Sequence, residues 1–238
     1  MKALLTLCLL SFGFLATVHA EPRSIRVFVA LCDNETQGII PVGARIGNGN
    51  DPDNNLYWGC SDGFALYFQN SRNWKRTASE KDVTPTILRR LTFHHVAADL
   101  KITADAYRGS EMKQCLLDFE AASTSGTHDL VAFIGHNGLM DFQLPAPRAN
   151  PGSPTDVIVL SCLSERYFGD RLRNAGCRTI LTTRQLMYPG AFLLHDVIES
   201  WRRGGSFADH RIAAGKAYAR NQGISAKAGA GIFAQLEE

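Results

Sequence analysis

The apolar positions of the chain fall into short runs separated by amphipathic stretches, and this alternation predicts strands that alternate with helices. Runs of β-branched and other apolar residues, or an alternating pattern, are typical of strands, and they cover 25–31, 100–107, 129–135, 156–160 and 179–182. Helical spacing and terminal capping residues predict helices over 56–68, 110–122, 166–175, 190–203 and 207–221. Segment 86–96 is ambiguous, and its second half, 91–96, is compatible with a strand.

Strands that alternate with helices imply a mainly parallel sheet with helices on both faces. We therefore expect the α/β fold class, built as a three-layer sandwich. Because no linker-like composition interrupts the pattern, residues 21–238 are predicted to form a single domain. The tail over 226–234 is rich in Ala and Gly and is expected to fray.

The first twenty residues have the pattern of a secretory signal peptide. A basic residue, Lys2, precedes an apolar run over 3–15, and a small residue, Ala20, ends the segment. A run of about 13 apolar residues is too short to span a bilayer, so no membrane anchor is expected, although a buried N-terminal helix is the alternative. The sequence predicts an exported protein, periplasmic or secreted, whose mature chain begins at Glu21.

Composition and cysteine content narrow the class of protein. The chain has a net charge of +2 and 45% hydrophobic residues, which is ordinary for a globular protein and lacks the basic excess of a nucleic-acid binder. Five cysteines follow the predicted signal peptide: Cys32, Cys60, Cys115, Cys162 and Cys177. An odd number in an exported protein leaves at least one unpaired thiol, and two disulfides with one free thiol are the simplest arrangement.

Two predicted strands each end at a residue that can carry chemistry. His136 follows the run VAFIG, and Cys162 follows the run VIVLS. Ligands of open parallel sheets bind beyond the carboxyl ends of the strands, and neighbouring strands lie about 4.8 Å apart. If the two strands are neighbours, the imidazole can activate the thiol for nucleophilic attack. The backbone N–H of Gly138 could then approach a developing oxyanion.

The sequence resembles the caspase-like (clan CD) cysteine peptidases in two motifs. The first is an apolar block that ends in His and Gly, and the second is a later apolar block that ends in Ser-Cys. The segment VIVLSCLS and the layout after it resemble the CHAT and gingipain forms. The resemblance implies a caspase-like fold, with Cys162 as nucleophile, His136 as general base and acid, a peptide or protein substrate, and neither metal nor cofactor. The family has His directly followed by Gly, whereas here Asn137 intervenes, so an oxyanion donor could come from Gly138 or from Asn137.

The family's substrate pocket is built partly from the loop after the first strand and from residues near the nucleophile. The resemblance therefore implies that Asp33 and Ser161 bind substrate. The long polar loop over 32–55, of a length that is usually functional or mobile, also carries other carboxylates, which favour a basic residue before the scissile bond. A solvated acidic loop and a calcium site are the alternatives, while Arg184 would favour an acidic substrate.

These patterns lead to three hypotheses about function. The first is an exported cysteine peptidase that hydrolyses peptide bonds through the Cys162–His136 dyad. The second is a non-catalytic caspase-like binding domain that uses the loop over 32–55 for recognition. The third is a cysteine hydrolase of small amides or thioesters that uses the same dyad.

Overall fold

A computed structural model describes residues 21–149 and 152–237, so the predicted signal peptide over 1–20 lies outside the described residues. One seven-stranded sheet has the order β2-β3-β4-β1-β5-β6-β7. Its strands are β1 (Arg23–Ala30), β2 (Trp74–Lys81), β3 (Ile87–His95), β4 (Leu100–Tyr107), β5 (Leu130–Ile134), β6 (Asp156–Leu160) and β7 (Arg178–Leu181). Strands β4, β1, β5, β6 and β7 are parallel, and β3 is antiparallel to both of its neighbours.

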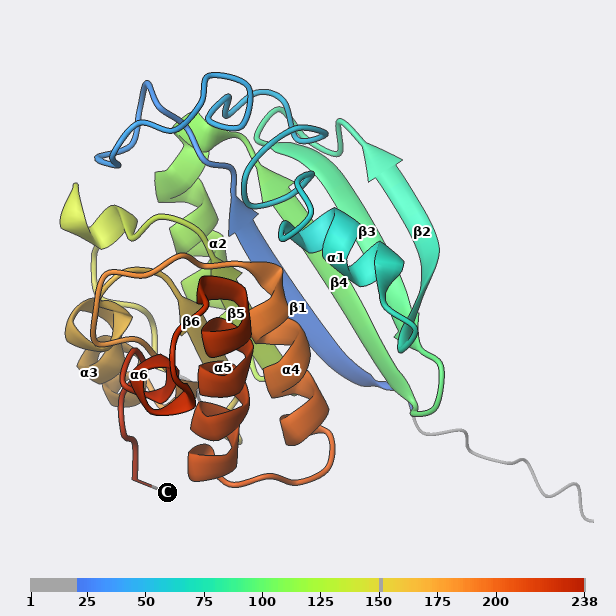
Figure 1. The fold of residues 1–238 in the computed structure, drawn as a ribbon, viewed down its shortest axis with the longest axis vertical. Coiled ribbons are helices and arrows are strands. Elements are labelled where there is room, and N and C mark those ends of the chain that lie inside the picture. The colour runs from blue at the N-terminus through green and yellow to red at the C-terminus, as the bar shows by residue number, and fades with distance from the viewer. Residues whose placement is uncertain (1–20, 150–151, 238) are drawn as a thin grey trace, which may run out of the picture.

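Helices cover both faces of this sheet (Figure 1). They are α1 (Phe64–Asn70), α2 (Met112–Ser123), α3 (Asp170–Asn174), α4 (Ala191–Trp201), α5 (Phe207–Gln222) and α6 (Ala226–Ala230), with short turns η1 (Gly109–Glu111), η2 (Gly138–Met140) and η3 (Glu165–Gly169). One apolar cluster packs α1, α4 and α5 on one face, and a second packs α2, η3 and α3 on the other. The predicted three-layer α/β sandwich with a mainly parallel sheet is confirmed.

Strands β5 and β6 are neighbours in the interior of the sheet, and each is followed by one of the two candidate residues. All five residues of each strand are buried. Along β5, Val131 and Phe133 face one apolar cluster while Ala132 and Ile134 face the other. A strand that is buried on both faces has an unbroken apolar sequence, which is why these strands could be predicted from the sequence.

One strand and one helix differ from the sequence prediction. Strand β2 was not predicted, because its sequence WKRTASEK is exposed beyond the first residue and lacks apolar alternation. The helix expected over 56–68 begins only at Phe64. Residues 56–63 form turns instead, and the buried Asn55 fixes their start, since its carbonyl accepts hydrogen bonds from the N–H groups of Trp58, Gly59 and Cys60.

The predicted fraying of the tail over 226–234 is wrong. Residues Ala226–Ala230 form α6, which packs closely on α5 through Gly215 and Gly229. Beyond it, Phe233 is fully buried and forms a β-bridge with Thr183. Small residues here allow two helices to approach each other, so the Ala and Gly content indicates close packing rather than disorder. Within the described residues, no helix is long and apolar enough to cross a membrane.

Candidate active site

His136 and Cys162 occupy equivalent positions after neighbouring strands. Strands β5 and β6 are parallel, and their last residues, Ile134 and Leu160, are paired in register. Each candidate residue follows its strand by two positions. The two turns are joined directly, because the Asn137 side-chain amide donates to the Cys162 carbonyl at 2.7 Å. The structure therefore brings both candidate residues to the same carboxyl edge of the sheet.

The His136 ring is buried and is held by a carboxylate that the sequence prediction missed. Its Nε2 lies 2.8 Å from Oδ2 of Asp141, and the His136 side chain is only 6% exposed. Asp141 directly follows η2 and lies five residues beyond His136. The same Oδ2 accepts the backbone N–H of Gly38 at 3.0 Å. A base that is oriented by a third group is part of the usual arrangement around an activated nucleophile.

Cys162 is partly exposed and lies against the loop that follows β7. Its Sγ is 3.4 Å from the backbone N and 3.5 Å from the carbonyl O of Met187. The next residue, Leu163, has a φ of +53°, which is uncommon for a bulky side chain. Its N–H donates to Gln185 in the same loop. Backbone strain of this kind persists where the surrounding structure enforces it and gathers at functional sites.

The other four cysteines are less suited to nucleophilic attack. Burial raises the pKa of the Cys32 and Cys177 thiols to about 11. It also raises the pKa of Cys115 and Cys60 above the ordinary value. Since the thiolate is the reactive form, burial reduces the reactivity of these four thiols. All five cysteines of the described residues are free thiols, and the expected pair of disulfides stays a prediction.

Gly138 packs against α2, and its neighbour Asn137 joins the two turns. A Cβ added to Gly138 would lie 2.7 Å from Cγ of Met112 and 2.8 Å from Cζ of Phe142. The Asn137 side chain accepts the N–H of Leu139 at 3.1 Å, besides donating to Cys162. The structure thus explains both residues by packing and positioning, and the oxyanion role expected of Gly138 stays a prediction.

The two expected substrate-binding residues lie near the carboxyl edge but are buried. Asp33 is 6% exposed. Its carboxylate accepts the N–H of Glu35 at 3.0 Å and the hydroxyl of Thr36 at 2.7 Å, so it folds its own loop. Ser161 is fully buried, and its hydroxyl has no hydrogen-bond partner. Neither side chain is open to a peptide in this structure.

The loop over 32–55 is built on hydrogen bonds from buried amides. Asn55 is fully buried and bonds the backbone N–H and carbonyl of Cys32, the N–H of Tyr57 and the carbonyl of Asn48. Asn34 bonds both backbone groups of Val42. The loop is therefore a defined structure that lies over the carboxyl end of β1 (Figure 1, blue).

The acidic residues of this region have separate partners. Asp51 accepts from Asn54 at 2.7 Å, Asp53 pairs with Arg89 at 3.1 Å, and Asp62 accepts from Asn221 at 2.9 Å. In the part of the chain that the structure describes, no three His, Cys, Asp or Glu side chains gather where they could hold a metal ion. The geometry offers no support for calcium in this loop.

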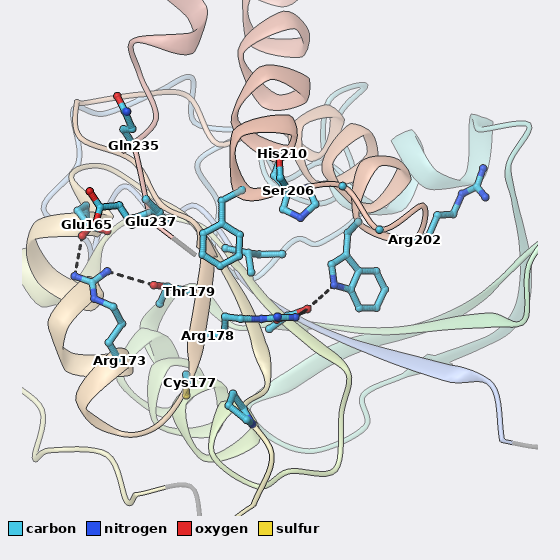
Figure 2. Close-up of a pocket in the computed structure, with 18 of the residues that line it drawn as sticks. Glu165, Arg173, Cys177, Arg178, Thr179, Arg202, Ser206, His210, Gln235 and Glu237 are labelled. Atoms are coloured by element: carbon cyan, nitrogen blue, oxygen red, sulfur yellow. Dashed lines mark hydrogen bonds and ion pairs between the residues drawn. The ribbon is translucent and has the colours of Figure 1, made fainter.

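A cavity of about 1120 Å³ lies at a different place (Figure 2). It is lined by the first three residues of β7 and by the C-terminal segment over 235–237. Two of its arginines are paired with carboxylates, as Arg173 bonds Glu165 at 2.9 Å and Arg178 bonds Asp156. Arg178 begins β7, whereas Cys162 follows the end of β6, so this cavity belongs to the opposite edge of the sheet from the dyad.

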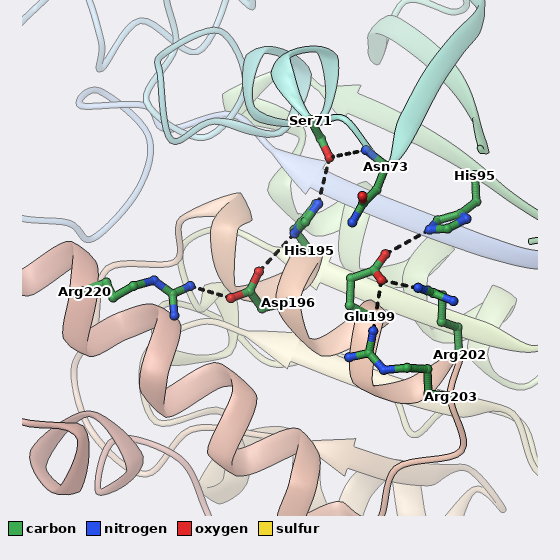
Figure 3. Close-up of polar contacts among 9 residues, drawn as sticks. All are labelled: Ser71, Asn73, His95, His195, Asp196, Glu199, Arg202, Arg203 and Arg220. Carbon is green, nitrogen blue, oxygen red and sulfur yellow. Dashed lines mark hydrogen bonds and ion pairs between the residues drawn. The ribbon is translucent and has the colours of Figure 1, made fainter. Parts of the chain in front are cut away.

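A polar network joins α1 and β3 to α4 on one face of the sheet (Figure 3). His195 lies 2.9 Å from the Ser71 hydroxyl and 3.0 Å from Asp196. Glu199 bonds His95 at 3.1 Å and Arg202 at 2.7 Å. Ser71 is the C-cap of α1 and also accepts a backbone N–H, so the contacts connect elements that pack against one another.

Comparisons with family models, with curated proteins and with solved structures gave no significant match for this chain. The caspase-like relationship inferred from the sequence therefore stays a prediction, and the function has to be argued from the site itself.

Proposed function

We propose that this chain is an exported cysteine peptidase that hydrolyses peptide bonds, with Cys162 as nucleophile and His136 as general base and acid. The observation that carries the proposal is the pair of in-register strand ends, with His136 oriented by a carboxylate after β5 and Cys162 partly exposed at the equivalent position after β6. The resemblance of the two motifs to caspase-like peptidases adds the substrate class, a peptide or protein.

The chemistry follows the usual two steps of covalent catalysis. The Cys162 sulfur attacks the carbonyl carbon of the scissile amide, and the thiol proton passes to the His136 imidazole. The imidazolium gives that proton to the leaving amine as the C–N bond breaks, which leaves a thioester. Water, deprotonated by His136, then attacks the thioester, and the thiol returns with the release of the acid.

The position of the two groups suits this role. The His136 ring is almost excluded from water, so its interaction with a carboxylate is stronger than it would be at the surface. Cys162 is partly exposed, as attack on a substrate requires. Because both residues belong to turns after buried strands, they are held more precisely than residues of a free loop would be.

The first experiment measures alkylation of the unreduced mature protein by iodoacetamide, residue by residue, against pH. Cys60, the other partly exposed thiol, is the internal reference. We expect Cys162 to react at least tenfold faster than Cys60 at pH 6.5, and His136→Ala to remove that advantage. Equal rates for the two thiols, or a disulfide at Cys162, would overturn the proposal.

The second experiment identifies the substrate by incubating the protein with a peptide library. We expect cleavage by the wild type and by Cys60→Ala, and none by Cys162→Ala. Hydrolysis of small amides or thioesters without peptide cleavage would favour the third hypothesis. If Cys162 is inert and its replacement leaves every interaction intact, the binding-domain hypothesis takes the place of the peptidase.

A further inference from the structure

We propose that Asp141 is a positioning residue for His136 and that it couples the loop over 32–55 to the reactivity of Cys162. This inference rests on the proposed function and deepens it. It adds a third residue to the dyad and gives the loop over 32–55 a direct effect on the chemistry.

A single carboxylate oxygen joins the two parts of the site. Oδ2 of Asp141 lies 2.8 Å from Nε2 of His136 and 3.0 Å from the backbone N of Gly38. Gly38 belongs to the loop over 32–55, which comes from the end of β1, whereas His136 comes from the end of β5. Any movement of Gly38 therefore changes the hydrogen bonding of the oxygen that holds the imidazole.

The backbone of the turn that carries Asp141 is held by hydrogen bonds within the turn. Asn137 caps η2 through the N–H of Leu139. The backbone N–H groups of Asp141 and Phe142 both donate to the Gly138 carbonyl at 3.0 Å. These bonds place the Asp141 backbone where its carboxylate reaches both His136 and Gly38.

The part of the loop over 32–55 that contacts Asp141 is also held by hydrogen bonds. Gln37, the residue before Gly38, donates to the carbonyls of Leu31 at 2.8 Å and Gly109 at 3.1 Å and accepts the N–H of Asp33 at 3.2 Å. This anchor holds the Gly38 N–H toward Asp141. A Cβ at Gly38 would overlap Oδ1 of Asp141, so the contact requires glycine at this position.

A carboxylate at this place stabilises the charged form of the imidazole. Transfer of the thiol proton to His136 creates an imidazolium, and Asp141 is the carboxylate bonded to it. Asp33 lies at the same edge, but its carboxylate bonds its own loop. Burial and the neighbouring thiols of Cys32 and Cys162 raise the pKa of Tyr57, which leaves that phenol neutral. Asp141 is thus the carboxylate that holds the His136 ring as it receives the thiol proton.

The test compares three variants by the pH dependence of Cys162 alkylation in the full chain. Asp141→Asn removes the charge while keeping the shape, and we expect about tenfold slower alkylation of Cys162 at pH 6.5. Gly38→Ala pushes the carboxylate away, and the same direction of change is expected. Gly43→Ala, in the same loop, meets only Cγ1 of Ile46 at 3.9 Å and serves as the matched control.

A second readout separates this inference from the proposed function. The ring signals of His136 are followed by NMR in the wild type and in Asp141→Asn, which needs no reactive thiol. We expect these signals to move when the carboxylate that contacts the ring is removed, and to return in part toward the wild type in Asp141→Glu. Unchanged ring signals overturn the inference even if Cys162 is reactive. Changed ring signals with an inert Cys162 support the positioning role and overturn the peptidase.

Discussion

Single buried side chains decide how the turns of this protein are shaped. Asn55 and Asn137 are both fully buried, and each bonds backbone groups of two separate segments. A buried amide that loses its partners leaves unsatisfied polar groups behind, which costs about 1–3 kcal/mol. At the scale of single residues, the backbone geometry near Cys162 therefore depends on buried side-chain amides as much as on His136 and Cys162 themselves.

Replacement of Asn137 tests whether a buried side-chain amide determines the geometry of the candidate site. In Asn137→Ala, the Cys162 carbonyl and the Leu139 N–H lose their partner. We expect the free energy of unfolding to fall by about 2 kcal/mol and the alkylation rate of Cys162 to drop at all pH values. Urea denaturation measures the first and mass spectrometry the second. The exposed Asn221→Ala is the control, and an equal effect of both variants would contradict this prediction.

Gly138 gives a second prediction at the residue scale. In Gly138→Ala, the added methyl group meets Met112 and Phe142 at less than 3 Å. Overpacking of this kind costs about 1–3 kcal/mol. We expect a lower urea midpoint for Gly138→Ala and an unchanged one for Gly43→Ala, whose Cβ has space. If the two variants have the same midpoint, the close packing of η2 on α2 is not important for stability.

Elements differ in how much of their structure could be predicted from the sequence. Strands β5 and β6 could be predicted because burial on both faces leaves an unbroken apolar run, whereas their adjacency was only assumed and is shown by the structure. The start of α1 could not be predicted, because Asn55 organises the preceding turns and is itself bonded to the distant Cys32. Asp141 was missed because the turn that brings its carboxylate back to His136 has no distinctive sequence pattern, and its other partner, Gly38, is 103 residues away along the chain.

The contacts of α4 lead to a prediction about pH. Burial alone would raise the pKa of Glu199, but hydrogen bonds from Arg202 and His95 outweigh it and lower the pKa below the ordinary value. A carboxyl with a lowered folded-state pKa stabilises the protein above its unfolded pKa, and this contribution is lost as the pH falls through the folded value. Glu199 therefore stabilises the attachment of α4 to β3 at neutral pH.

We expect Glu199→Gln to lower the free energy of unfolding at pH 7 by about 2 kcal/mol, typical of charged hydrogen bonds. The difference from the wild type should shrink once the pH falls below about 4.5. Urea denaturation from pH 3 to pH 7 measures both. Asp170→Asn, at a largely exposed carboxylate paired with Arg173, is the control, for which at most a small change is expected.

At the scale of the whole molecule, the C-terminal segment packs against one side of the core. Phe233 is fully buried, lies 6.3 Å from the ring of Tyr218 and bridges Thr183. Backbone bonds join Arg184 to Ile232 and Ala234 to Thr182. These contacts attach the segment over 232–234 to the residues that follow β7, so Phe233 and Ala234 belong to the core.

Replacement of Phe233 tests how much the C-terminal segment contributes to the core. We expect Phe233→Ala to destabilise the protein by about 3–5 kcal/mol, because it leaves a cavity in the core. The partly exposed Leu236→Ala, three residues further on, is expected to have a much smaller effect. Thermal or urea unfolding compares the two, and similar midpoints would show that the C-terminal segment does not contribute to the core.

The exposed charges of β2 have a consequence for how the molecule behaves among its own copies. A sheet edge offers unpaired backbone groups to any other strand, and charged side chains are one means by which proteins discourage such pairing. Strand β2 is at one edge and carries Lys75, Arg76, Glu80 and Lys81 on exposed positions. These charged residues leave β2 without the apolar alternation that predicts a strand. They also protect the edge of the sheet from aggregation.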